Sequence, residues 1–131
     1  HTFSFKWVRL FYMYGAGQAK NSLISQLEQA IQRNDLEFNM SGGEQLRDYL
    51  PIDLVADYLV SCSLQTEITG IINCCSGRPI SVRKFVEKYL EEKNINIKLN
   101  LGYYPYADYE PMAFWGDDTK LKKILSLSNS K

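Results

Sequence analysis

A run of apolar and aromatic residues from Phe5 to Tyr14 constrains the fold of this chain more than any other feature. Only Lys6 and Arg9 interrupt it. Near-continuous apolar character, without alternation, is typical of a strand buried on both faces of a parallel sheet. The run starts within the first residues, so little sequence precedes it to supply neighbouring strands. We therefore expect the chain to be a piece of a larger sheet.

Capping residues mark where four helices are expected to begin. After Ser81, apolar side chains recur every three or four positions, as on one face of a helix. Ser22, or Asn21 before it, can cap an earlier helix in the same way. Pro51 suits the start of a third helix, and Asp118 can cap a last one. The last six residues of the chain are expected to fray.

Extended segments are expected between these helices, separated by glycine and proline. They are 36–40, 47–51, 69–73 and 95–101. Strands that alternate with helices predict an α/β fold. A length of 131 residues is enough for one domain with a modest core.

The charge balance limits the classes of partner. Lys plus Arg and Asp plus Glu both number 15, so the formal net charge is zero. A neutral chain has no general attraction for nucleic acid or for an anionic membrane. No apolar stretch approaches the roughly 18 residues of a membrane span. We expect neither partner, and a small anion would have to be bound by a few local groups.

The cysteines and the histidine argue against disulfide and metal chemistry. Cys62, Cys74 and Cys75 are odd in number and two of them are adjacent, so no disulfide framework is indicated. No Cys-x-x-Cys pair occurs and His1 is the single histidine, so we expect no metal site. Buried, reduced thiols would be typical of a cytoplasmic protein.

No generic catalytic or phosphate-binding motif is present. The sequence offers no histidine paired with a serine or cysteine, no G-x-G-x-x-G fingerprint and no P-loop. Carboxylate pairs occur at Asp117-Asp118 and Glu91-Glu92, where helix capping and solvation account for them. We assign no catalytic residue from these patterns.

Five short segments do carry a specific signal when they are taken in order. They are Arg9–Gln18, Ser22–Ile24, Gly43–Ala56, Ile71–Ser81 and Phe114–Lys120. Together they resemble the C-terminal part of the extended short-chain dehydrogenase/reductase family. The family patterns include Arg-Leu-x-Asn-x-Tyr-Gly-Pro-Gly, Gly-x-x-x-Arg-Asp-Tyr and Trp-x-Asp-x-Ser-Lys. Each segment alone is a weak match, and the order of all five makes the match specific.

The resemblance implies the last strand of a Rossmann-type domain in residues 1–18 and the small α/β substrate-binding domain in 19–131. It implies NAD or NADP in the full-length enzyme and a nucleoside-diphosphate sugar as substrate. The reaction would be hydride exchange leading to epimerisation, dehydration or ketone reduction. The family's glycine fingerprint and Tyr-x-x-x-Lys pair would lie upstream, in a missing N-terminal Rossmann domain.

We therefore expect the chain to lack that catalytic pair, to bind no cofactor alone and to be inactive by itself. A homo-oligomer is a further possibility that the sequence leaves open. The loop tyrosines Tyr103 and Tyr106 are followed four positions later by Ala107 and Glu110, not by lysine. An alternative is a stand-alone nucleotide-binding or regulatory module that has lost catalysis.

The resemblance also implies roles for individual residues. Arg47 matches a phosphate-contacting arginine, and a guanidinium suits a diphosphate because it forms two parallel charged hydrogen bonds. The alternative is a surface or cap arginine paired with Asp48. Phe38 and Met40 match strand positions that lie along the nucleobase, with ordinary core packing as the alternative.

Four further positions match the helix start and the strand end of the family site. Ser22 and Leu23 match a helix start near the phosphates, where backbone N–H groups favour an anion. Leu10 and Phe11 match the strand end that faces the nicotinamide, and core packing is the alternative for both.

Two other positions complete the candidate site. Tyr12 stands where the family commonly has an asparagine that touches the sugar, and a phenol cannot replace an amide's paired donor and acceptor. Glu110 and the loop 103–109 match the region that closes over the ribose or the phosphate.

Overall fold

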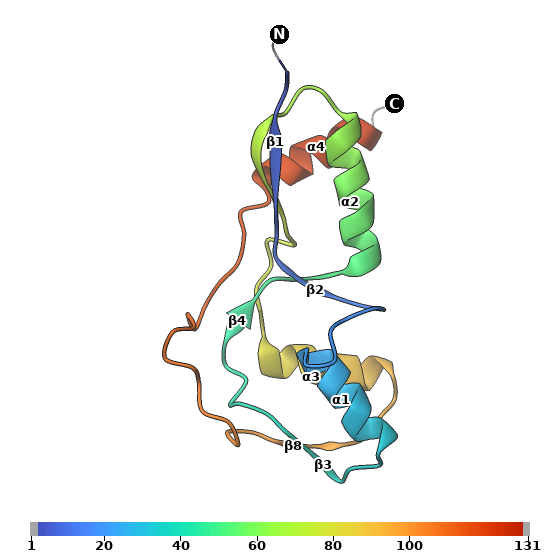
Figure 1. Ribbon diagram of the computed structural model, residues 1–131, viewed down its shortest axis with the longest axis vertical. Helices are drawn as coiled ribbons and strands as arrows, with labels where there is room; N and C mark the ends of the chain where they lie inside the picture. The colour runs from blue at the N-terminus through green and yellow to red at the C-terminus, as the bar shows by residue number, and fades with distance from the viewer. Residues whose placement is uncertain (1–2, 130–131) are drawn as a thin grey trace. The chain divides into compact units, whose positions relative to one another are not determined.

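The computed structural model describes residues 3–129, and the chain forms two compact units (Figure 1). Unit 1 consists of residues 1–16, 48–79 and 115–131, and unit 2 of 17–47 and 80–114. Each unit combines segments that are distant in the sequence. The expected α/β fold is confirmed. The boundary between residues 18 and 19 refers to the family's domains and stays a prediction.

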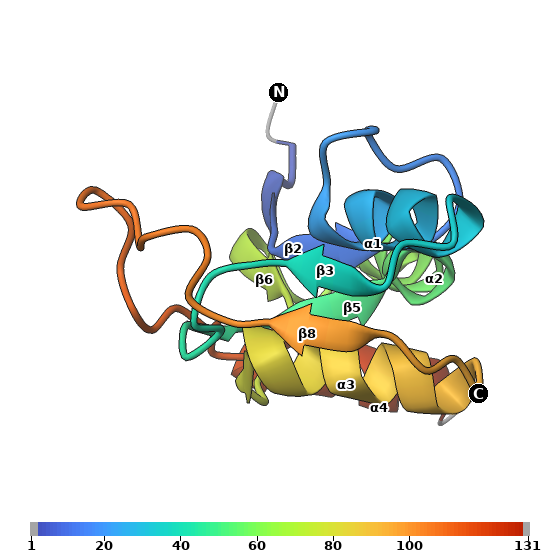
Figure 2. The ribbon, with the colours of Figure 1, turned by 90° about the horizontal axis from the view of Figure 1, so that it is seen from below.

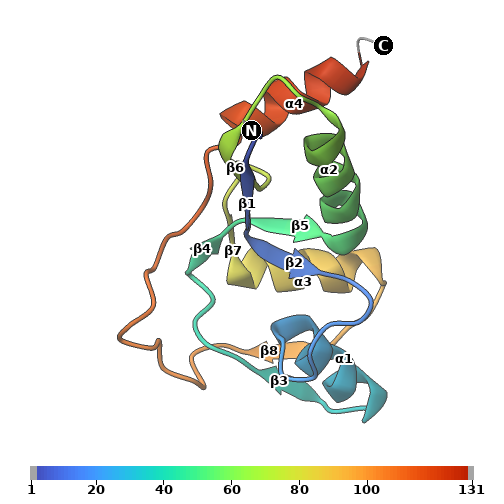
Figure 3. The same cartoon turned by 45° about the horizontal axis from the view of Figure 1, so that its top comes forward.

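Unit 1 contains two pairs of parallel strands. Strand β1 (Lys6–Leu10) pairs with β6 (Gly70–Cys74) along its whole length. Strand β2 (Tyr12–Tyr14) pairs with β5 (Tyr49–Pro51), beside it in Figure 3. The chain therefore changes its pairing partner at Phe11, between β1 and β2.

Two helices of unit 1, α2 (Ile52–Leu64) and α4 (Thr119–Asn129), pack against β6 and against each other. Ile72 of β6 and Ile124 of α4 are fully buried in the core that they share. Val8 of β1 packs against the same core. The helices thus cover one face of the β1–β6 pair.

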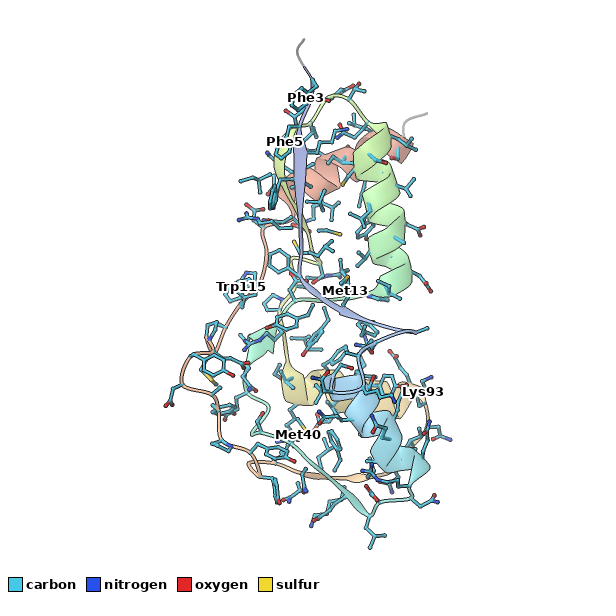
Figure 4. All side chains as sticks on the ribbon, in the orientation of Figure 1. Phe3, Phe5, Met13, Met40, Lys93 and Trp115 are labelled. Atoms are coloured by element: carbon cyan, nitrogen blue, oxygen red, sulfur yellow. The ribbon has the colours of Figure 1, made fainter. Side chains whose placement is uncertain are left out.

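The opposite face of that pair is uncovered among the described residues. Phe5, Trp7 and Ile71 lie on it and are 56%, 58% and 52% exposed, and we call these three side chains the outer face. Phe5 projects beside β1 in Figure 4. The expectation of one strand over residues 5–14 was wrong, because the run forms two strands. Helices bury only one side of β1, in line with the expectation that the chain is a piece of a larger sheet.

Unit 2 has two helices and four short strands. They are α1 (Leu23–Gln32), β3 (Glu37–Asn39), β4 (Leu46–Arg47), β7 (Ile80–Ser81), α3 (Val82–Glu92) and β8 (Lys98–Asn100). Strands β3 and β8 are parallel, and β4 and β7 are antiparallel. Figures 1 and 2 show both helices on the same face of the β3–β8 pair. The hydroxyl of Tyr89 on α3 donates to the Glu28 carboxylate on α1, which joins the two helices.

The caps of α1 and α3 confirm the sequence analysis. The hydroxyl of Ser22 accepts from the backbone N–H of Ser25, and the hydroxyl of Ser81 accepts from that of Lys84. Helix α2 begins directly after Pro51, as expected. The starts of α1 and α3 were predictable because a capping side chain acts within one turn of the chain.

The last helix begins directly after Asp118, as predicted, but its side-chain cap and its C-terminal end differ from the prediction. At its start, the carboxylate of Asp117 rather than Asp118 accepts from the backbone N–H of Thr119, at 2.9 Å. Asp118 forms an ion pair with Lys122 instead. Residues 126–129, expected to fray, continue the helix, and residues 130 and 131 lie outside the described part of the chain, as does His1. Within residues 3–129, no helix combines the length and apolar character needed to cross a membrane.

Candidate functional site

Arg47 is a buried cation at the end of strand β4 in unit 2. Its side chain is 5% exposed, although a guanidinium is costly to remove from water. Nη1 donates to the carbonyl oxygen of Leu46 at 2.8 Å, and Nη2 lies 3.7 Å from Oε2 of Glu110. Burial fixes the rotamer of this long side chain, so the fork of donors is held in place before any ligand arrives.

The alternative of a surface arginine is wrong, because Arg47 is buried. Successive side chains of an extended chain point to opposite sides. The Asp48 carboxylate therefore turns away and forms its hydrogen bonds within unit 1, described below.

Glu110 belongs to a long loop that is anchored on both sides of it. Before Glu110, the hydroxyl of Tyr106 donates to the Glu44 carboxylate at 3.1 Å. After it, the backbone N–H of Leu46 donates to the carbonyl of Met112 at 2.8 Å. Glu110 itself is 47% exposed, so one edge of the ion pair with Arg47 faces water.

A glycine sets the path of the backbone that leads into Arg47. Gly43 has a φ of +72°, which an L side chain rarely adopts, and a Cβ there would lie 2.6 Å from Cβ of Arg83. The close approach lets the backbone N–H of Arg83 donate to the carbonyl of Gly43 at 2.9 Å. The segment before Arg47 is thereby tied to the first turn of α3.

Phe38 lies on β3, and Met40, which Figure 4 labels, follows the end of that strand. Both are core residues, 6% and 3% exposed. The carbonyl of Met40 accepts from the N–H groups of Tyr103 and Tyr104, so this oxygen is already used by the loop. Phe38 and Tyr104 also line a hollow of about 180 Å³ beside α1. The structure thus places Phe38, but not the Met40 carbonyl, where a flat ligand group could reach it.

The start of helix α1 has some of the features of an anion-binding site. The Ser22 hydroxyl lies 3.4 Å from the backbone nitrogen of Ser25, so the cap bond is long. Leu23 opens the helix, and the N–H groups of a first turn point out along the helix axis. Ser22, Leu23, Phe38, Arg47 and Glu110 all belong to unit 2.

The remaining candidates, Leu10, Phe11 and Tyr12, belong to unit 1. Leu10 is the last residue of β1 and is 48% exposed. Phe11 is half-buried, and its ring lies close to Gly116: a Cβ at position 116 would be 2.7 Å from Cζ of Phe11. Tyr12 is 45% exposed and its ring packs at a tilt against Tyr49, with centroids 5.7 Å apart. Leu10 and Tyr12 therefore present side chains outward, and Phe11 turns inward.

Asp48 is a fully buried carboxylate that the sequence analysis missed as a structural centre. Oδ1 accepts from the backbone N–H of Ser76 at 2.7 Å, and Oδ2 from those of Gly77 and Gly116 at 2.9 and 3.3 Å. Three charged hydrogen bonds offset the burial of the carboxylate. Its partners lie 28 to 68 residues away, so no local pattern could reveal them.

The sequence analysis also overlooked a Tyr-x-x-x-Lys spacing, at Tyr89 and Lys93, so its expectation that none occurs was wrong. The structure argues against a catalytic role for this pair. Burial, and then the hydrogen bond to Glu28, raise the pKa of Tyr89 to about 12, whereas a tyrosine acid/base needs a pKa nearer the working pH. Lys93 lies over the ring, 5.5 Å from its centroid.

The three cysteines are buried free thiols, as predicted. Burial, and then the Asp48 charge, raise the pKa of Cys75 to about 12, and burial raises that of Cys74 to about 11. Neither thiol is a nucleophile near neutral pH. Among residues 3–129, no group of three His, Cys, Asp or Glu side chains is placed to hold a metal ion.

Comparison with known proteins gives one sequence relative and many similar folds. The chain is 32% identical over 111 residues to dTDP-6-deoxy-L-talose 4-dehydrogenase (NAD(+)) of Aggregatibacter actinomycetemcomitans, a match that covers 85% of this chain and 41% of that protein. No protein-family model matches. The chain thus spans about two fifths of the length of this curated relative.

Two solved structures show the same fold at lower sequence identity. UDP-N-acetylglucosamine 4-epimerase from Methanobrevibacter ruminantium M1, in complex with UDP-N-acetylmuramic acid, matches with a TM-score of 0.79 at 21% identity, over 92% of this chain and 39% of that one. UDP-glucuronic acid 4-epimerase from Bacillus cereus, in complex with UDP-glucuronic acid and NAD, matches with a TM-score of 0.74 at 23% identity, over 91% and 38%.

Proposed function

Because this chain belongs to the extended short-chain dehydrogenase/reductase family, we propose that it binds the nucleoside diphosphate of an activated sugar within an NAD(P)-dependent epimerase, dehydratase or reductase. Arg47 carries this proposal. It is a buried cation of unit 2, burial holds its side chain in one rotamer, and the half-exposed carboxylate of Glu110 lies beside it. A preformed guanidinium suits the two adjacent phosphates of a nucleoside diphosphate.

Phe38 and Glu110 support a nucleotide in unit 2. Phe38 offers an aromatic surface at the 180 Å³ hollow, where a base could stack. Glu110 is an acceptor for the hydroxyl groups of a ribose. The first turn of α1, at Ser22 and Leu23, adds backbone donors for a phosphate.

We propose that the cofactor is held mainly by a preceding Rossmann domain and that this chain adds only the end of β1. Ligands of open parallel sheets bind beyond the carboxyl ends of the strands, and the half-exposed Leu10 is the last residue of β1. An apolar side chain there fits the face of a nicotinamide ring, which exchanges hydride with the sugar when bound. Phe11 faces inward, so it would act by supporting Leu10.

The outer face of β1–β6 supports the presence of such a domain. Parallel strands are usually covered on both sides, and the side that carries Phe5, Trp7 and Ile71 is uncovered in this chain. We also propose a cytoplasmic location for the whole enzyme, in line with its three reduced thiols.

The 131-residue chain alone should not turn over dTDP- or UDP-sugars with added NAD or NADP. Its one Tyr-x-x-x-Lys pair has its phenol bonded to Glu28 and a pKa raised to about 12, so it cannot serve as the acid/base. Nucleotide-sugar turnover would be followed by reduced-cofactor absorbance and product chromatography. Cofactor-dependent turnover by the purified chain would overturn this part of the proposal.

Arg47→Ala should weaken the binding of UDP or dTDP roughly ten- to a hundredfold, because a charged hydrogen bond contributes about 1.5–3 kcal/mol. Arg47→Lys should recover only part of the loss, since an ammonium lacks the planar fork. Isothermal titration calorimetry measures all three proteins.

The matched control is Arg83→Ala, which removes the same charge from an exposed pair with Glu87 in the same unit. Arg33 is less suitable because it lines the hollow next to Phe38. The Arg83 variant should bind like the wild type. Equal affinity in wild type and Arg47→Ala would remove Arg47 from the site.

A further inference from the structure

The phosphate-binding group proposed above already has an anion beside it. Arg47 is 5% exposed at its side chain, and the carboxylate of Glu110 lies 3.7 Å from its Nη2. A buried guanidinium is destabilised unless a negative charge is close by. In the ligand-free chain, Glu110 supplies such a charge.

We propose that Glu110 is an internal substitute for a phosphate: it neutralises Arg47 in the free protein and is displaced from it when a nucleoside diphosphate binds. This inference rests on the proposed function of Arg47. It assigns to Glu110 a role that precedes any contact with a ribose, because the carboxylate competes with the diphosphate for the same donor.

The geometry of the pair favours exchange. A distance of 3.7 Å between Nη2 and Oε2 is longer than the roughly 2.7–2.9 Å of a charged hydrogen bond, so the two groups attract without a direct bond. A phosphate group can approach the Arg47 guanidinium to hydrogen-bonding distance. It would then form two short charged hydrogen bonds in place of the longer-range attraction to Glu110. Glu110 is 47% exposed, so its return to water requires little new solvation.

The loop permits Glu110 to leave without unfolding. One anchor is the pair of Tyr106 and Glu44, and the other is the backbone bond between Leu46 and Met112. Glu110 lies between these anchors, where Tyr109 next to it is 86% exposed. A rotamer change, or a shift of residues 107–111, therefore moves the Glu110 carboxylate away from Arg47 while both anchors stay in place.

If Glu110 remained in position, two anions would share one guanidinium. Like charges a few ångströms apart repel, and the repulsion is stronger near the protein than in bulk water. The exchange therefore lowers the apparent affinity for the diphosphate by the free energy of the Arg47–Glu110 pair. Removal of the carboxylate charge should raise that affinity.

The test compares Glu110→Gln with Glu87→Gln in the 131-residue chain. Glu87 is a matched control, because its carboxylate is 45% exposed and pairs with another arginine, Arg83, in the same unit. The probes are inorganic pyrophosphate, which has no ribose, and UDP. Calorimetric titration of each probe is made for wild type, both variants, Arg47→Ala and the double variant of residues 47 and 110.

Glu110→Gln should bind pyrophosphate about three- to tenfold more tightly than wild type, while Glu87→Gln should stay within about twofold. The gain should vanish in the Arg47→Ala background, because the two residues act on one interaction. A weaker affinity for UDP alongside the tighter pyrophosphate would show that Glu110 also contacts the ribose, and the inference would stand.

Three distinguishable outcomes would contradict the exchange of Glu110, the proposed function of Arg47, or both. Unchanged or weaker pyrophosphate binding by Glu110→Gln overturns the exchange but leaves Arg47 as the phosphate ligand. Equal affinities of wild type and Arg47→Ala overturn the proposed function itself. No binding of either probe by wild type or Glu110→Gln at about 1 mM ligand overturns both.

Discussion

The two units each contain a parallel pair of strands, and the pairs differ in how their apolar side chains are covered. In unit 2, Phe38 is 6% exposed and belongs to β3, and α1 and α3 lie on one face of the β3–β8 pair (Figure 2). In unit 1, Trp7 of β1 is 58% exposed, although β1 and β6 form a longer ladder. Unit 2 therefore buries its largest strand side chain by itself, and unit 1 does not.

The difference shows that a long ladder does not imply a complete sheet. Hydrogen bonds between strands satisfy the backbone, whereas burial of side chains requires a second layer on each face. Helices α2 and α4 supply one layer to β1–β6 through Ile72 and Ile124. The outer face is suited to a further layer that these residues do not provide.

The largest expected effect is the loss of stability when a large side chain is removed from each strand pair. Phe38→Ala should lower the free energy of unfolding by about 3–5 kcal/mol, because it removes a buried ring and leaves a cavity. Trp7→Ala should cost less than about 1 kcal/mol, because the ring is already largely in water. Urea denaturation followed by far-ultraviolet circular dichroism measures both. Similar losses would mean that the outer face is buried in solution, against another copy or segment.

A smaller effect concerns association through the outer face. Exposed apolar side chains along β1 should cause the isolated chain to self-associate as its concentration rises. Trp7→Gln should weaken this association roughly tenfold or more, because a buried tryptophan often dominates an interface. Sedimentation velocity over a concentration series gives the dissociation constants. A wild-type chain that stays monomeric at high concentration, with slow amide exchange along β1, would contradict this expectation.

The smallest expected effect is a difference between the two units in the pH at which their stability begins to fall. Burial raises the pKa of Cys75 in unit 1 from 9.0 to about 12, and burial and Glu28 raise that of Tyr89 in unit 2 from 10.0 to about 12. A group whose pKa is higher in the folded than in the unfolded protein makes its full contribution to stability below its unfolded-state pKa. This contribution is lost as the pH rises toward its folded-state pKa. Unit 1 should therefore weaken from about pH 9 and unit 2 from about pH 10.

Tryptophan fluorescence can test this order, because Trp7 and Trp115 both belong to unit 1. Urea midpoints from fluorescence should fall before those from circular dichroism as the pH is raised. A fluorescence midpoint that stays constant between about pH 8 and 11 would show that the thiols contribute no pH dependence.

Local signals explain which parts of the fold were predictable. Helices α1 and α3 could be placed because Ser22 and Ser81 cap within one turn and the apolar period follows directly. Strand β1 was placed correctly, and its uncovered side agrees with the expectation that the chain is a piece of a larger sheet. Apolar sequence shows that a side chain is suited to burial, and cannot show whether this chain supplies the covering layer.

Candidate site residues could be proposed from the sequence, but their contacts could not. Arg47 was singled out by its segment, and the structure adds that it is buried and lies beside Glu110. The pairing joins positions 63 residues apart, so neither pattern nor period could indicate it. Tyr89 and Lys93 show the opposite case, in which a spacing that matches a catalytic motif belongs to the end of an ordinary helix.

The three hydrogen bonds of Asp48 also bear on the order in which the chain can fold. They join residue 48 to Ser76 and Gly77, made soon after it, and to Gly116, made much later. Contacts between distant positions slow folding because a long loop must close first. During synthesis, unit 2 has all its segments by residue 114, whereas unit 1 must wait for Gly116 and α4. Until then the emerging polypeptide carries an open apolar core at Ile72, the stage at which premature release or chaperone capture would have its greatest effect.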